Sequence, residues 1–268
     1  MLLRLAAVLL CLAATGCARI ETDEAPPAAV PAVAAPAAGP TDLSVATDSL
    51  VDRSTPGLVV AVALPRIEGI AGAAAPDALR AANRGMRDSV EAFVRAVTPT
   101  EPPGEHDVTD LFETSGGFET TLFESDLYSG VVDVMSFAGG AHPNTFVLGL
   151  TVDLRTGAPV ALADLFRAGA PFLDTLSAHV GRGVAAQYAE RAGVDLAEAR
   201  TIVAGYNPGG VHLSAPSWSL APEGLVVHVP PYAVLSYAAG GYRVTVPSAA
   251  LAGLWAAEGP AARLYAGR

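Results

Sequence analysis

The chain has 268 residues, with 16 basic residues against 27 Asp and Glu, and its formal net charge is −11 at pH 7. All of the basic residues are Arg, because the sequence contains no Lys. The composition therefore excludes a P-loop lysine, a Schiff-base lysine and a serine–lysine pair. The net negative charge also argues against nucleic acid as a partner, since phosphate binding needs clustered basic residues.

The first 16 residues are predicted to be a secretory signal peptide. One early charge at Arg4 is followed by an apolar run over residues 5–12, which is too short to span a bilayer as a mature helix. Residues 14–17, Ala-Thr-Gly-Cys, resemble a bacterial lipobox, in which the cysteine is lipidated and becomes the first mature residue. The resemblance implies a lipid anchor at Cys17, and ordinary signal cleavage that leaves a free thiol is the alternative.

The segment after the predicted cleavage site indicates where the protein is placed. Ala18 follows Cys17, where an Asp would resemble an inner-membrane retention signal, so we expect the bacterial cell envelope, on the outer membrane facing the periplasm in a diderm. Residues 17–49 are predicted to be a lipidated cysteine and an Ala/Pro-rich tether. Cleavage removes Cys11 and leaves no second cysteine, which excludes a disulfide framework and a cysteine-ligated zinc site.

The first half of the folded part shows one strand, one helix and then strand-like alternation. An apolar run predicts a strand over residues 57–65, and apolar spacings of three and four predict a helix from Pro76 to just before Pro99. Two-residue alternation then predicts strands over 118–125, 130–137 and 145–154. In the last of these strands, Leu150 and Val152 share a buried face, and we expect Thr151 and Asp153 on a solvated one.

The C-terminal half adds further helices and strands. Apolar residues every fourth position predict a helix over 172–188, and Asp195 with Glu198 has capping-box spacing for a third helix. Strands are expected over 211–214, 224–230 and 242–247, and then a short helix that begins at Ser248. The order of elements predicts an α+β fold, an antiparallel β-sheet with helices packed on it, in two intimately associated subdomains over residues 50–135 and 136–268.

Two segments supply the candidate binding residues. Residues 139–145 form a Gly-Gly-Ala-His-Pro-Asn-Thr loop, which is either a plain hairpin loop or a ligand contact. Tyrosines at 232, 237 and 242 suit either core edges or a carbohydrate-stacking groove. A single histidine makes a poor metal site, so we expect neither metal nor cofactor. The candidate ligand-binding residues are Gly139, Gly140, His142, Asn144, Tyr232 and Tyr237.

Three stretches, residues 137–166, 221–251 and the strand–helix unit at 57–65 and 80–94, resemble a known family. They are similar to the extracellular module of RsiV-type anti-sigma factors and to the N-terminal module of PdaC-type peptidoglycan deacetylases. The resemblance implies a sensing or wall-facing module whose partner is peptidoglycan or a basic lysozyme-like protein. No Asp-Asp or His-x-x-x-His metal-binding run of the deacetylase kind occurs in the sequence.

Three hypotheses on function follow. The favoured one is a membrane-anchored lipoprotein with a non-catalytic binding or sensing module for cell-wall material or a lysozyme-like protein, to which the net negative charge would steer a cationic partner. The second is a cell-wall hydrolase centred on His142 and either Asp133 or Asp153. The third is a structural envelope lipoprotein that docks on another protein.

Overall fold

The structure, a computed structural model, describes residues 43–69, 76–100, 112–124 and 126–266. The predicted signal peptide, Cys17 and residues 17–42 of the predicted tether lie outside the described residues. Residues 43–49, the end of the predicted tether, belong to the first strand. No helix of the described part is long and apolar enough to cross a membrane.

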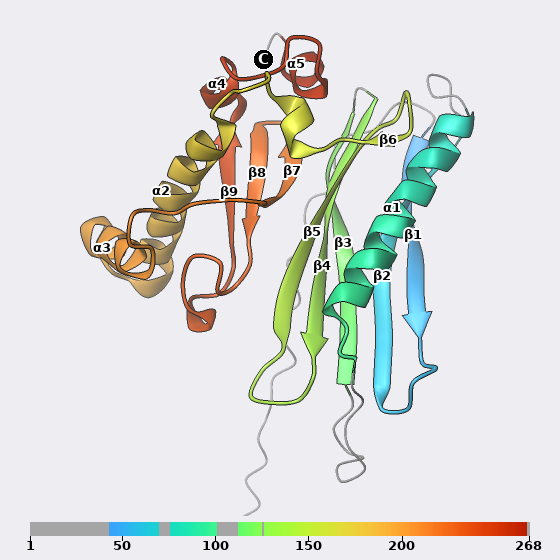
Figure 1. Ribbon diagram of the computed structural model, residues 1–268, viewed down its shortest axis with the longest axis horizontal. Coiled ribbons are helices and arrows are strands. Elements are labelled where there is room, and N and C mark those ends of the chain that lie inside the picture. Colours follow the sequence, from blue (N-terminus) through green and yellow to red (C-terminus); the bar gives the residue numbers. More distant parts are fainter. Residues whose placement is uncertain (1–42, 70–75, 101–111, 125, 267–268) are drawn as a thin grey trace, which may run out of the picture. The chain divides into compact units, whose positions relative to one another are not determined.

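Six strands form one sheet in the order in which they follow along the chain (Figure 1). Neighbouring strands are antiparallel, apart from β2 and β3, which are parallel because the helix α1 connects them as a crossover. The predicted α+β fold with helices packed on a mainly antiparallel sheet is confirmed. The strands are β1 (Leu43–Asp52), β2 (Leu58–Gly69), β3 (Phe112–Glu124), β4 (Leu127–Phe137), β5 (Asn144–Asp153) and β6 (Ala158–Pro159).

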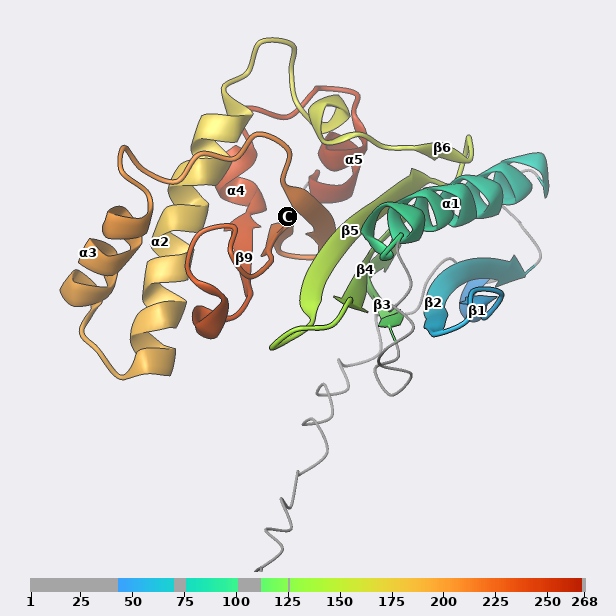
Figure 2. The same ribbon diagram turned by 60° about the horizontal axis from the view of Figure 1, so that its bottom comes forward.

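The helix α1 (Pro76–Val97) covers one face of this sheet (Figure 2). Its apolar face follows the three-and-four spacing of the sequence, and Ala82, Met86 and Val90 are fully buried against the sheet. The Asn83 side chain fixes the position of the helix on β2, because it accepts a hydrogen bond from the Ile67 N–H and donates one to the Ile67 carbonyl, both at 2.8 Å.

A second sheet of three antiparallel strands follows, with α2 packed on β9 (Figure 1). The expected strand over 211–214 is wrong: the Leu213 N–H donates to the Ser177 Oγ on α2 at 3.0 Å, so this segment is a loop on the helix. The elements are η1 (Leu162–Leu165), α2 (Phe172–Ala192), α3 (Leu196–Tyr206), β7 (Ser217–Ala221), β8 (Gly224–Val229), η2 (Tyr237–Ala239), β9 (Tyr242–Pro247), α4 (Ser248–Leu251) and α5 (Pro260–Tyr265).

Strand β7 contacts β3, β4 and β5, and small polar side chains join it to them. The Leu220 N–H donates to the Ser129 Oγ at 2.8 Å, and the Ser217 hydroxyl donates to the Val147 carbonyl at 2.6 Å. A Cβ on Gly149 would overlap the carbonyl oxygen of Trp218, so the missing side chain permits the close approach of β7 to β5.

This contact corrects one sequence expectation. The second face of β5, expected to be solvated, is buried at its C-terminal end: Thr151 is 5% exposed and Asp153 is 8% exposed. Alternation in a strand tells which residues share a face, but it does not tell what covers that face.

The expected subdomain boundary between residues 135 and 136 falls within β4, and the six-stranded sheet continues past it to Pro159.

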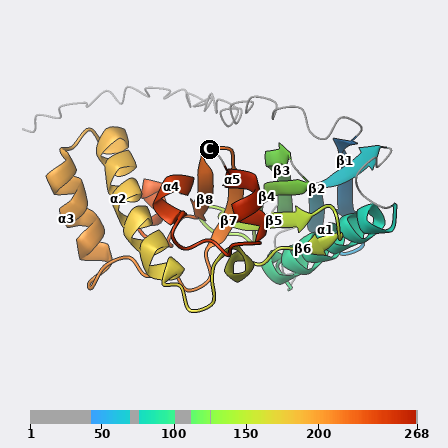
Figure 3. The ribbon, with the colours of Figure 1, turned by 90° about the horizontal axis from the view of Figure 1, so that it is seen from above.

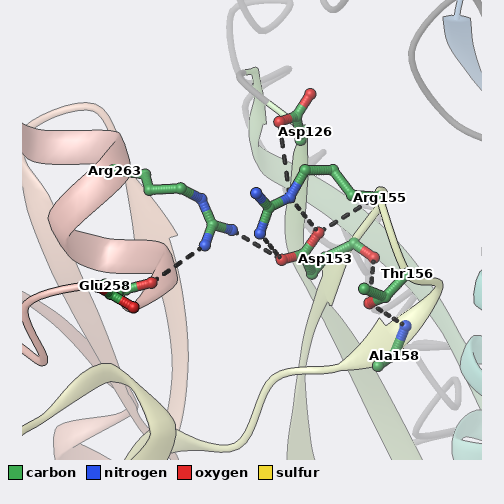
Figure 4. Close-up of polar contacts among 7 residues, drawn as sticks. All are labelled: Asp126, Asp153, Arg155, Thr156, Ala158, Glu258 and Arg263. Atoms are coloured by element: carbon green, nitrogen blue, oxygen red, sulfur yellow. Dashed lines mark hydrogen bonds and ion pairs between the residues drawn. The ribbon is translucent and has the colours of Figure 1, made fainter.

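The carboxylate of Asp153 lies between two arginines at the end of β5 (Figure 4). Its Oδ2 accepts hydrogen bonds from Arg155 at 2.9 Å and from Arg263 on α5 at 2.7 Å. Burial favours the neutral acid, but the hydrogen bonds and charges of the arginines outweigh it and hold the pKa of Asp153 below its usual value. This ion-paired cluster therefore joins α5 to the six-stranded sheet.

Candidate functional site

The glycine-rich loop between β4 and β5 presents His142. Gly139 and Gly140 have φ values of 81° and 100°, which residues with a Cβ rarely adopt, so the two glycines permit the turn that leads into β5. The ring Nδ1 of His142 lies 3.0 Å from the Pro143 carbonyl oxygen. This local contact orients the imidazole on the loop.

The imidazole of His142 is brought together with two of the candidate tyrosines. Its ring stacks on Tyr237, with ring centroids 3.7 Å apart and an angle of 13° between the planes. Tyr232 lies beside both, with its ring centroid 5.5 Å from that of Tyr237 and its hydroxyl 3.4 Å from the His142 Nε2. We call His142, Tyr232 and Tyr237 the aromatic cluster; its members are separated by about 90 residues of sequence.

Tyr232 has an unusual backbone for its residue type. Its φ is +69°, in the left-handed region that residues with a side chain seldom occupy, and 61% of its surface is exposed. Such a conformation costs about 1–3 kcal/mol and tends to occur where a side chain has a task other than packing. The backbone holds this ring in solvent, next to the imidazole.

A cleft of about 570 Å³ lies next to the aromatic cluster, and Tyr237 is one of its lining residues. Asn144, another predicted binding residue, is exposed at the start of β5 and precedes Thr145, which lines the cleft. The walls come from both sheets and from α2: Asp133, Thr145 and Val147 on β4 and β5, His228, Tyr242 and Arg243 on β8 and β9, and Gln187 and Arg191 on α2.

Arg243 is the central charge of the cleft. Its guanidinium forms ion pairs with Glu119 on β3 and, at 3.3 Å, with Asp133 on β4. One cation from β9 thus pairs with a carboxylate from each of two neighbouring strands. Burial raises the pKa of the Asp133 carboxyl, and the nearby Arg243 charge opposes that rise. The cleft wall therefore offers guanidinium donors from Arg243 and carboxylate acceptors from Asp133.

A second arginine holds the loop that carries Tyr237. Arg191 on α2 donates hydrogen bonds to the carbonyls of Ala239 and Gly241, at 3.3 and 2.8 Å. Its guanidinium also lies over the ring of Tyr242, 4.3 Å from the centroid. The contacts fix the loop after η2, and so they fix the position of the Tyr237 ring.

His228 contributes to the floor of the cleft as a neutral group. It is 3% exposed, and its Nε2 lies 2.9 Å from the hydroxyl of the fully buried Ser219. Burial, together with the charge of Arg243, lowers the pKa of His228 to about 4. His228 is therefore uncharged at neutral pH.

The arrangement does not assemble the expected hydrolase pairs. Asp153 lies at the far end of β5 from the His142 loop, about 30 Å along the strand by the rise per residue. In the described part of the chain, His142 forms no contact with a carboxylate, and no group of three His, Cys, Asp or Glu side chains is placed to hold a metal ion. Asp133 reaches the cleft, but it is paired with Arg243.

Sequence reasoning missed the cleft arginines. Arg191 and Arg243 are isolated basic residues in helix and strand patterns, and nothing in their local sequence indicates that they meet. The segment 237–240 indicates only that a partner is needed, because a loop that positions the Tyr237 ring requires hydrogen bonds from another part of the chain. That partner is Arg191, 46 residues before Tyr237 along the chain.

Comparisons with known proteins agree with this fold. Residues 163–249 match the family "Protein of unknown function (DUF3298)". A DUF3298 family protein from Pseudomonas aeruginosa PAO1 has a similar structure, with a TM-score of 0.56 and 14% identity over 85% of this chain and 98% of that one.

A second solved structure, of a DUF3298 family member from Bacteroides fragilis NCTC 9343, is similar with a TM-score of 0.55 and 14% identity, over 84% of this chain and 97% of that one. A search of the curated proteins finds no match. The stretch from η1 to α4 is thus similar to the DUF3298 family, and over most of its length the chain shares the fold of these two proteins.

Proposed function

We propose that this chain is the non-catalytic binding module of an envelope lipoprotein, and that its cleft binds the glycan of peptidoglycan. One observation carries the proposal: the exposed Tyr232 and the His142–Tyr237 stack lie at the entrance of a cleft with polar walls. Tyrosine rings present an apolar face that a sugar ring covers, with the hydroxyl still in water. The carboxylate of Asp133 and the guanidinium of Arg243 supply an acceptor and donors for sugar hydroxyls.

The geometry favours binding over hydrolysis. Glycoside hydrolysis needs two carboxyl groups about 5–10 Å apart on either side of the bond, one of them free to donate a proton. Asp133 is the one carboxylate among the described residues that line the cleft, and it is ion-paired with Arg243, which also pairs with Glu119 on β3. The resemblance to RsiV-type and PdaC-type modules points in the same direction, because it concerns their sensing or wall-facing part.

Titration with soluble peptidoglycan fragments tests the glycan proposal. Tyr237→Ala removes the ring on which His142 stacks, and binding is expected to weaken at least about tenfold. The control is Tyr206→Ala, which removes the same ring from an exposed position on α3, outside the cleft walls. Equal loss in both variants, or no binding by the unmodified chain, would contradict the proposal.

A cationic, lysozyme-like protein is the second candidate partner. The net charge of −11 favours it, and an exposed tyrosine such as Tyr232 is the kind of side chain that anchors protein–protein interfaces. We expect such binding to weaken with salt mainly through a slower association rate. Tyr232→Ala is the variant that tests it, and salt-independent binding would argue against charge steering.

The envelope placement rests on the lipobox-like residues at Cys17. Fractionation of cells that express the full chain tests it, with Cys17→Ser as the variant. We expect the unmodified chain in the membrane fraction and the variant in the soluble one, because the acyl chains provide the anchoring energy. Membrane retention of the variant would contradict lipidation at this residue.

A further inference from the structure

A second cavity lies away from the cleft, between the helices α2 and α3. The two helices form a hairpin closed by a short turn at Gly193, and they lie side by side (Figure 3). Between them and the loop that follows α3 is a cavity of about 450 Å³, which we call the hairpin groove. Its volume falls within the range of roughly 300–1,000 Å³ that is usual for small-molecule sites.

The floor of the hairpin groove is built from small and apolar residues. Ala178, Gly181 and Ala185 contribute from α2, and Val203 and Ala204 from α3. At Gly181 the side-chain position is free of any contact closer than 3.5 Å, which leaves the groove open at its centre. Such a floor suits hydrocarbon.

The neutral polar side chains of the hairpin groove each form at least one hydrogen bond within the protein. The Ser177 Oγ accepts from the Leu213 N–H, and the Asn207 amide donates to the carbonyls of Val203 and Val234. The His212 Nε2 lies 3.0 Å from the Gly209 carbonyl. These internal bonds leave few neutral groups with which a peptide backbone could pair, and each backbone group left unpaired costs about 1–3 kcal/mol, whereas an acyl chain has no group that needs a partner.

Two arginines at the groove lack a carboxylate partner. Arg182 on α2 and Arg200 on α3 face the cavity, and neither forms an ion pair with any acid in the described ranges. The acid that lines the groove, Asp174, lies two turns before Arg182, about 12 Å along the axis of α2. On α2, the acidic and the basic residue of the groove are therefore separated along the helix.

From these observations we infer that the hairpin groove binds a single-chain fatty acid. The acyl chain lies on the floor of small residues, and the carboxylate faces Arg182 and Arg200, away from Asp174. An anion with an apolar body matches both the exposed guanidinium groups of Arg182 and Arg200 and the floor of small and apolar residues. The site is separate from the proposed glycan cleft, and it stands whether or not the cleft binds glycan.

Calorimetric titration of the purified full chain with decanoate, below its micelle concentration, tests the inference. We expect saturable binding of one decanoate, at least about tenfold tighter than that of decanol, which has the same chain but no charge. Decylamine, with the opposite charge, is expected not to bind. Decanol binding as tight as decanoate, or tighter binding of a trialanine peptide, would overturn the inference.

Two pairs of variants place the ligand. Ala178→Leu fills the groove from an exposed helix position and should abolish binding, whereas Ala186→Leu makes the same change on α2 outside the groove and should not. The double variant Arg182→Gln/Arg200→Gln should weaken decanoate roughly tenfold and leave decanol unchanged. Its control is Arg84→Gln, an exposed arginine on α1.

Folding is checked independently by the circular dichroism and melting temperature of each variant. Decanoate that protects the unmodified chain, but not Ala178→Leu, against thermal unfolding supports the inference even if the variant melts slightly lower. Unchanged decanoate binding in Ala178→Leu, or in the double arginine variant, would overturn it.

Discussion

Asp153 and Arg263 form an ion pair between residues 110 positions apart, with 2.7 Å between the Asp153 Oδ2 and the Arg263 Nη2 (Figure 4). The pair connects the last residue of β5 to the C-terminal helix α5. Because the Asp153 side chain is only 11% exposed, removing its charge leaves Arg263 without its carboxylate partner in a partly buried site. α5 is thereby coupled to the sheet through one side chain.

Asp153→Asn is expected to destabilise the protein by about 2 kcal/mol at pH 7, because it breaks two partly buried ion pairs, one with Arg155 and one with Arg263. Urea denaturation measures the effect. Asp126→Asn is the control: Asp126 lies 3.8 Å from Arg155, is more exposed, and has a positive φ that Asn tolerates, so a loss below about 0.5 kcal/mol is expected. Equal losses in the two variants would show that Asp153 has no special structural role.

Gly149→Ala is expected to lower stability by about 3 kcal/mol or more. The added Cβ would overlap the carbonyl oxygen of Trp218, and β7 would have to move away from β5. Gly117→Ala on β3 makes the same change where no atom lies within 4 Å, so its effect should be small. Melting temperatures of both variants test this, and a matched loss in the two would mean that the cost comes from strand backbone and not from the contact.

The spacing of apolar residues was enough to predict the elements that bury one face and expose the other. The helix α1 has one apolar face, begins at Pro76 and ends two residues before Pro99, so its bounds agree with those expected. Asp195 at the start of α3 accepts a hydrogen bond from the Glu198 N–H, as the capping spacing indicates. These features depend on contacts within a few residues, which sequence spacing encodes directly.

The burial of the second β5 face was not predictable in the same way. Gly149, Thr151 and Asp153 have the pattern of a polar face, but Gly149 lies against Trp218 of β7, and the buried Asp153 is paired with Arg263 on α5. The residue types that form hydrogen bonds with a crossing strand, such as Ser, Thr and Gly, are also the residue types found on faces exposed to water. The aromatic cluster was anticipated as a set of residue types, but its closeness to Arg191 and Arg243 depends on long-range packing.

His228 provides a prediction on pH. Its pKa in the folded protein is about 4, below the 6.5 of an unfolded histidine, so the unfolded chain binds a proton first as the pH falls. The stability that His228 contributes is complete above about pH 6.5 and is lost as the pH falls towards 4, by roughly 3 kcal/mol in total. In His228→Gln this part of the pH dependence should disappear.

Chemical denaturation at pH 7, 5.5 and 4 gives the free energy of unfolding at each pH, and its slope against pH is compared between His228→Gln and the unmodified chain. His212→Gln is the control, because His212 is exposed and the buried His228 remains in that variant. An unchanged slope in His228→Gln would show that the acid sensitivity of the protein arises elsewhere.

Tyr232→Asn separates the structural from the binding role of the aromatic cluster. Asn tolerates the positive φ of this position better than Tyr, and the lost ring is mostly in solvent, so stability should be unchanged or rise by up to about 1 kcal/mol. Binding of peptidoglycan fragments should fall about tenfold, because the exposed ring is lost. Parallel urea denaturation and fragment titration test both, with Tyr206→Asn as the control. If Tyr232→Asn lost stability and kept full binding, the ring would belong to the packing of the loop, and the strained backbone would have no link to the cleft.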